Sequence, residues 1–205
     1  MRALLLLLAS LTACTELRTP RAGSLPPLAL VSATNDPARA AIDDAAEAWG
    51  APGLAGDPAA MARAAALLEW LAADIPTDRR WTQIPRQLGY DLGFARTEMR
   101  LALGISLQAP PRAVIGPLTA AAMAGDDAAA RASALSGAVF TQGADSTAAR
   151  LAAPGRLSLP PTATANLRRE VARLDAVRGW NQNPVRLEES IRAGERSTGG
   201  LGTYY

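Results

Sequence analysis

The sequence contains no histidine and no lysine, only one cysteine, Cys14, and few aromatic residues, at 4% of the chain. Without histidine the chain has neither a Ser-His-Asp triad nor a histidine–cysteine zinc site, and one cysteine excludes an intrachain disulfide framework. No phosphate-binding glycine loop, dinucleotide fingerprint, nucleophile elbow or zinc-protease motif occurs either. Carboxylates are therefore the side chains on which an enzymatic reaction would depend.

The composition of the 205 residues fits one folded domain. Hydrophobic residues make up 49% of the chain, which is enough for a packed core. The formal net charge is only +2, so the basic balance does not indicate a nucleic-acid partner. We expect no nucleic acid, no metal and no cofactor.

The first 14 residues carry the strongest signal in the chain. Arg2 precedes an apolar run of 11 residues, Ala3 to Ala13, which is too short for a helix that spans a bilayer. A short apolar run behind a basic residue is typical of a secretory signal peptide. We therefore expect a signal peptide over residues 1–13.

The end of this run indicates which kind of signal it is. Leu11-Thr12-Ala13-Cys14 resembles the lipobox of bacterial lipoprotein precursors. The resemblance covers residues 1–14 only, and the family of the remaining chain is not recognised. It implies cleavage before Cys14, lipid on that cysteine, and a protein anchored in the bacterial cell envelope facing the periplasm. In enteric bacteria, an aspartate directly after the lipidated cysteine favours retention in the inner membrane. Thr15 occupies that position here, which favours the outer membrane.

Helical spacing of apolar residues, with proline and aspartate at the starts, predicts an all-α fold. We expect an irregular bundle of about six or seven helices over residues 36–180, after a lipidated N-terminus and flexible tether over residues 14–35. A C-terminal tail, residues 181–205, is expected to be partly disordered. Asp36-Pro37 and Asp57-Pro58 predict two helix starts, and Asp126 a third. Pro117 is expected to break a helix, and residues 154–161 to form a linker before a helix that begins at Thr164 or Asn166.

The same spacing predicts which side chains are buried. Nine core residues are expected: Ile42, Trp49, Leu68, Leu71, Leu92, Met99, Leu103, Val171 and Leu174. On the longest helix, residues 85–105, Tyr90, Phe94 and Leu101 are expected to widen the buried stripe. Gly89 and Gly93 lie four residues apart on that helix, a spacing that allows close approach of a neighbouring backbone.

Asp78-Arg79-Arg80-Trp81 is the most unusual short stretch. Two guanidinium groups beside an indole can bind a phosphate, a carboxylate or a lipid headgroup. Arg96 and Arg100 follow within one helix, at a spacing that can flank a groove. The candidate ligand-binding residues are therefore Arg79, Arg80, Trp81, Arg96 and Arg100. The simpler interpretation is an interhelix loop that tucks Trp81 into the core, with the other two arginines paired to local acids.

Other charged clusters are most simply solvated faces. The acidic group Asp43, Asp44 and Glu47 has a conceivable metal or acid–base role, but lacks the ligand spacing of a calcium loop. The basic group Arg168, Arg169 and Arg173 has a conceivable role at an anionic lipid or glycan surface.

Three functions remain open for the predicted envelope lipoprotein. The first is a non-enzymatic interaction or structural role at the membrane, with an envelope protein as partner. The second is a module that binds a small anionic or amphiphilic ligand in a groove between the long helix and the Arg79–Trp81 loop. The third is an enzyme that uses carboxylates. A large apolar cavity with inward-facing arginines favours the second. A flat exposed apolar patch, well above a few hundred Å², favours the first, and a close set of buried acids in one pocket favours the third.

Overall fold

The computed structural model describes residues 24–181, so the predicted signal peptide, Cys14, and the tail from residue 182 lie outside the described residues. Seven α-helices occur in the described part: α2 (Pro37–Gly50), α3 (Pro58–Asp74), α4 (Arg86–Leu103), α5 (Pro111–Met123), α6 (Ala128–Ala134), α7 (Ala144–Ala152) and α8 (Leu159–Ala176). Short 3₁₀ turns η1 (Leu28–Leu30), η2 (Arg79–Trp81) and η3 (Gly179–Asn181) complete it. These residues form no β-strand beyond one isolated bridge, between Ile105 and Phe140. The prediction of an all-α, irregular helical bundle is confirmed.

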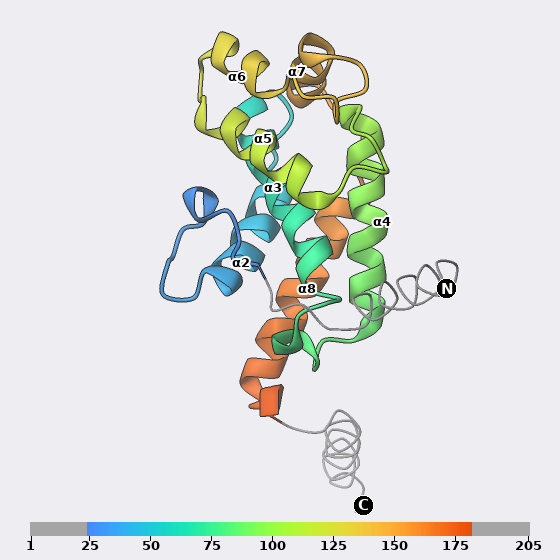
Figure 1. The fold of residues 1–205 in the computed structure, drawn as a ribbon. Helices are drawn as coiled ribbons and strands as arrows, with labels where there is room; N and C mark the ends of the chain where they lie inside the picture. Colours follow the sequence, from blue (N-terminus) through green and yellow to red (C-terminus); the bar gives the residue numbers. More distant parts are fainter. Residues whose placement is uncertain (1–23, 182–205) are drawn as a thin grey trace, which may run out of the picture.

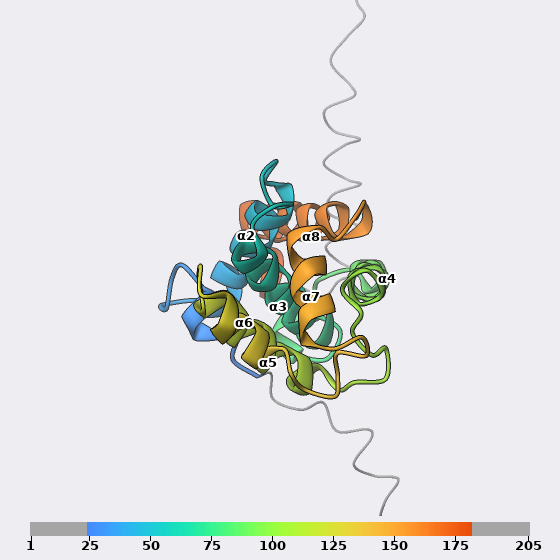
Figure 2. The same ribbon diagram turned by 90° about the horizontal axis from the view of Figure 1, so that it is seen from above.

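Helix α3 is the centre of the bundle. It contacts α2, α4, α5 and α7, and Figure 2 shows these helices arranged around it. A helix that is apolar on every side is stable only when it is enclosed. Twelve of the 17 residues of α3 are buried, five of them alanines. Because the alanine side chain is small, the surrounding helices can approach the backbone of α3 closely.

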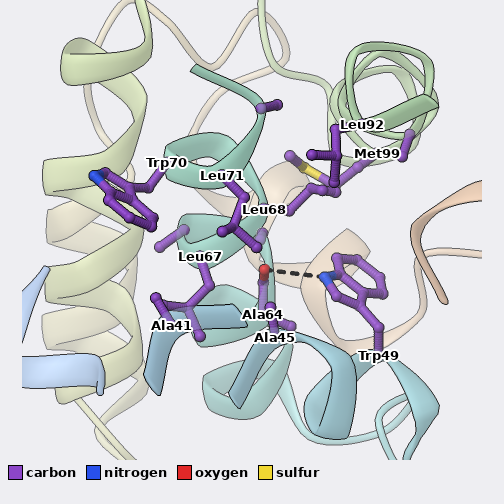
Figure 3. Close-up of a cluster of buried hydrophobic side chains, with 14 of the residues drawn as sticks. Ala41, Ala45, Trp49, Ala64, Leu67, Leu68, Trp70, Leu71, Leu92 and Met99 are labelled. Atoms are coloured by element: carbon purple, nitrogen blue, oxygen red, sulfur yellow. Dashed lines mark hydrogen bonds between the residues drawn. The ribbon is translucent and has the colours of Figure 1, made fainter. Parts of the chain in front are cut away.

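The core extends from both sides of α3 (Figure 3). Leu92 and Met99 of α4 face one side, while Trp70 of α3 points the opposite way. The indole of Trp49 donates a hydrogen bond of 3.1 Å to the main-chain oxygen of Ala64. This bond satisfies a polar group that burial would otherwise leave unpaired. All nine predicted core residues are buried.

Two of the three helix starts predicted from an aspartate are as expected. Asp36 and Asp57 accept hydrogen bonds from the main-chain N–H three residues on, and a proline follows each in the first turn. The start at Asp126 is wrong by one residue, because Asp127 caps α6 instead, with its carboxylate 2.9 Å from the N–H of Ala130.

Prolines lie inside two helices at positions where the sequence predicts a break or a linker. Helix α5 is continuous through Pro117, because its buried residues Val114, Leu118 and Ala121 pack along one face. The predicted linker over residues 154–161 is too long, because α8 begins at Leu159 and not at Thr164 or Asn166. Proline is tolerated there because the first-turn N–H groups of a helix have no partner within the helix.

The outer face of α4 differs from the expectation. Tyr90, Phe94 and Leu101 are 63%, 64% and 61% exposed. The buried stripe of α4 is narrow, since α3 and α8 cover only one side of it. These three side chains therefore project to solvent instead of widening the core.

The end of the expected tether is docked on the bundle. The Trp70 indole donates to the main-chain oxygen of Ser24 at 3.1 Å, and Leu30 is buried. The N–H of Ser32 donates to Asp44 at 2.6 Å. Residues 24–35 therefore pack against α2 and α3. Among the described residues, no helix is long and apolar enough to cross a membrane.

Candidate ligand-binding groove

A groove of about 930 Å³ lies between the η2 turn and helix α4. Small-molecule sites have volumes of roughly 300–1,000 Å³. One wall is the end of α3 and the loop that carries η2, and the other wall is the first half of α4. In Figure 1 this region lies at the lower end of the green helix α4.

The lining combines positive charge with aromatic surface. Three arginines, Arg79, Arg86 and Arg96, line it, and none has an ion-pair partner among residues 24–181. The aromatic members are Trp81, Tyr90 and Phe94. Arg86 and Arg96 are ten residues apart on one helix, which places their Cα atoms about 15 Å apart. The carboxylate in the lining, Asp78, is paired with Arg80, so the groove has a net positive charge.

Two glycines of α4, Gly89 and Gly93, line the groove and add no side chain to it. A Cβ atom on Gly89 would lie 3.5 Å from the Cβ of Pro76, so α4 and the end of α3 meet closely at this point. A Cβ on Gly93 would meet nothing within 4 Å. Gly93 therefore leaves open space on this face of α4.

A network of aromatic and charged groups fixes Trp81. Its indole N–H donates to Asp74 at 2.8 Å, and its ring meets the edge of Trp180, with centroids 5.9 Å apart. The guanidinium of Arg80 lies 5.3 Å from the Trp81 ring centroid and 6.0 Å from that of Trp70. Cation–π contacts and a buried hydrogen bond hold the η2 wall in one shape. A preformed wall lowers the ordering cost of binding.

Two carboxylates in this end of the molecule have shifted pKa values. Burial raises the pKa of Asp74, although the hydrogen bond from Trp81 and the charge of Arg80 oppose the shift. Hydrogen bonds from Arg39 lower the pKa of Asp175, and the indole of Trp180 adds to that effect. Asp74 is therefore the carboxylate in this network that gains a proton more readily than usual.

The structure separates the five candidate residues into two groups. Arg79, Trp81 and Arg96 line the groove together. Arg80 is not part of the lining, because Asp74 and Asp78 hold its guanidinium.

Arg100 is in the core instead of the groove. It is 3% exposed and forms a bidentate pair with Glu69, which is fully buried. Its other terminal nitrogen donates to the main-chain oxygens of Ser106, Leu107 and Ala109. Arg100 thus ties the connection between α4 and α5 to α3, and each of its three guanidinium nitrogens donates a hydrogen bond.

Arg86, Tyr90 and Phe94 also line the groove but are not among the candidate residues predicted from the sequence. The signal was present, because Arg86, Tyr90, Gly93 and Thr97 recur at helical spacing of three or four residues on one face. The apolar spacing on this helix predicts instead that the two aromatic residues are buried, whereas both are exposed.

The acidic cluster on α2 does not form a site. Asp44 holds Ser32 and lies 3.5 Å from a guanidinium nitrogen of Arg63, while Asp43 and Glu47 are exposed. Within the described part of the chain, no group of three metal-ligating side chains occurs.

No family model matches the chain, and neither a curated protein nor a solved structure matches it.

Proposed function

We propose that this protein is a lipid-anchored protein of the bacterial envelope whose helical domain binds an anionic amphiphile in the α4–η2 groove. One observation supports the binding function above all: three arginines without an ion-pair partner among residues 24–181, together with three aromatic side chains, line one groove of about 930 Å³. The planar guanidinium group binds a carboxylate or a phosphate with two hydrogen bonds at once. The aromatic side chains between the arginines suit the apolar part of the same ligand.

The anchor is supported by the sequence alone. The lipobox-like Leu11–Cys14 motif implies lipid on Cys14, facing the periplasm, and the position of Thr15 favours the outer membrane. Cys14→Ser is expected to block processing or to release the protein from the membrane fraction. Mass spectrometry of the mature N-terminus tests the same point. An unacylated mature terminus at another residue would contradict it.

The groove is tested with a chain that begins at Thr15, because it lacks the anchor. Lysophosphatidylglycerol and dodecanoate, below their micelle concentrations, are titrated into it by calorimetry. Replacing Arg96 by Gln removes a charge-assisted bond of about 1.5–3 kcal/mol and weakens binding about tenfold or more. Arg168→Gln, an exposed arginine on α8 outside the groove, is the matched control. Equal losses from the two variants, or no binding, would contradict the proposal.

The glycine wall offers a test that spares the fold. Gly93→Leu fills the open space of the groove and is expected to abolish binding. Ala120→Leu is the matched control, because Ala120 is exposed on α5 and lies outside the groove lining. Gly93→Leu improves helix propensity by up to about 1 kcal/mol and Ala120→Leu changes it little, so neither should lower the melting temperature. Retained binding in the Gly93 variant would place the ligand elsewhere.

A second function, docking of an envelope protein, is supported by the exposed stripe on α4. Leu101 continues the line of Tyr90 and Phe94 but lies outside the groove lining. If a partner protein binds this stripe, Leu101→Ser should weaken its binding while lysolipid binding stays unchanged.

A further inference from the structure

We infer that the groove takes its ligand, an acidic phospholipid, from the bilayer that carries the anchor. This inference rests on the proposed function and names the source of its ligand. It depends on where the chain from the anchor reaches the folded domain, and on what surrounds that point.

The chain reaches the domain close to the groove. Ser24 is held by the indole of Trp70, at 3.1 Å to its main-chain oxygen and 3.2 Å to its hydroxyl. The guanidinium of Arg80 lies over both the Trp70 ring and the Trp81 ring. Trp81 lines the groove. One side chain therefore separates the tryptophan that binds the incoming chain from the tryptophan of the groove wall.

The chain between the anchor and this point is short. Ser24 is ten residues after Cys14. Ten residues span at most about 35 Å, even when fully extended. The groove must therefore stay within a few tens of ångströms of the bilayer surface, where the local concentration of phospholipid far exceeds that of any free amphiphile.

The side chains around the groove suit such a surface. Arg79 and Arg86 are exposed and unpaired among the described residues, and Tyr90 and Phe94 are more than half exposed. Basic residues near an anionic leaflet are attracted to its surface charge. Tyrosine is enriched at the level of lipid headgroups. The combination favours an acidic phospholipid over a zwitterionic one.

The experiment uses the mature, acylated chain in vesicles. Because Cys14 carries the lipid, Thr97→Cys supplies one free thiol in the groove for a fluorescent label. Thr162→Cys is the matched control. Thr97 and Thr162 are both exposed, and the hydroxyl of each donates a hydrogen bond of 3.0 Å to the main-chain oxygen four residues earlier. Thr97 lines the groove and Thr162 does not.

Vesicles of phosphatidylcholine with a fraction of phosphatidylglycerol brominated on its acyl chains are expected to quench the label at position 97 several-fold more than the label at position 162. Doubling the number of residues between Cys14 and Ser24 lowers the effective lipid concentration and should reduce this quenching. Vesicles in which only the phosphatidylcholine is brominated should not produce the difference.

The outcomes separate this inference from the proposed function. If the label at position 97 is unquenched in the vesicles but the unanchored chain that carries the same label binds lysophosphatidylglycerol, the groove binds a free amphiphile and the membrane source is wrong. Equal quenching at both positions shows general proximity to the bilayer and also overturns the inference. If the unanchored chain binds no lysolipid, the proposed function itself fails.

Discussion

The buried pair between Glu69 and Arg100 shows how one interaction joins three elements. Glu69 belongs to α3 and Arg100 to α4, and the arginine also holds the main chain that leads to α5. Two charges leave water to form this pair, so its net contribution is smaller than its geometry suggests. Removing only one partner, by contrast, leaves the other charge buried and uncompensated.

We therefore expect Glu69→Leu to lower the free energy of unfolding by about 3–5 kcal/mol. Urea unfolding measures it. Glu47→Leu, at an exposed glutamate on α2, should change stability by less than about 0.5 kcal/mol. Adding Arg100→Met to Glu69→Leu should recover part of the loss. A Glu69 variant as stable as the Glu47 variant would show that the pair contributes little.

Asp74 and Asp175 are expected to change stability with pH in opposite directions. The raised pKa of Asp74 means that its contribution is present below the unfolded value of 3.8 and is lost as pH rises through the folded pKa. The lowered pKa of Asp175 means that its contribution is present above 3.8 and is lost as pH falls through the folded pKa. The exposed position of Asp175 reduces its effect through solvent screening.

Comparison of each aspartate with its asparagine variant over pH tests this. As pH falls from neutral, the unfolding free energy of the wild type should rise relative to Asp74→Asn. It should fall relative to Asp175→Asn once the pH is below 3.8. The same sign for both variants would show that burial of Asp74 does not dominate its titration.

At the scale of helices, α5 contains a proline, Pro117, whose cost to the helix is offset by packing of the buried face of α5. Pro117 lacks the N–H that would donate to Ala113, and its ring crowds that turn. We expect Pro117→Ala to raise the free energy of unfolding by about 2 kcal/mol, after the loss of proline's restriction on the unfolded chain. Thermal unfolding measures the gain. An unchanged melting temperature would mean that α5 is already distorted enough to accommodate the ring.

The helices were predictable where local chemistry and packing agree. Asp36 and Asp57, each followed by proline, specify helix starts by capping alone. The extent of α5 and the start of α8 depend on packing against other helices, which a local pattern does not contain. The exposed aromatics on α4 have the same origin: the width of a buried face is set by the neighbours that cover it.

The candidate site was predictable only in part. That Arg79, Trp81 and Arg96 lie together in one groove followed from charge and spacing, whereas the pairing of Arg80 with Asp74 and Asp78 did not. The burial of Arg100 did not, because its partner Glu69 is 31 residues earlier on another helix. Whether an arginine faces solvent or the core depends on such distant partners.

At the scale of the whole molecule, the folded unit begins before the first long helix. Burial of Leu30 stabilises the fold by about 2 kcal/mol, and the segment also pairs Asp44 and Trp70. The free energy of unfolding of a chain that begins at Asn35 should therefore be at least about 2 kcal/mol lower than that of a chain that begins at Ser24. Urea unfolding of the two chains measures the difference. Equal stability would show that residues 24–34 only rest on the surface.

The contact between Trp81 and Trp180 has a spectroscopic consequence. Two indole rings with centroids 5.9 Å apart and planes inclined at 64° couple their electronic transitions. Such coupling produces paired bands of opposite sign in circular dichroism, superimposed on the helix signal. Since one ring belongs to η2 and the other to η3, after α8, the couplet reports the docking of these two segments (Figure 1). Its disappearance at a lower temperature than the helix signal would reveal that this end of the bundle opens first.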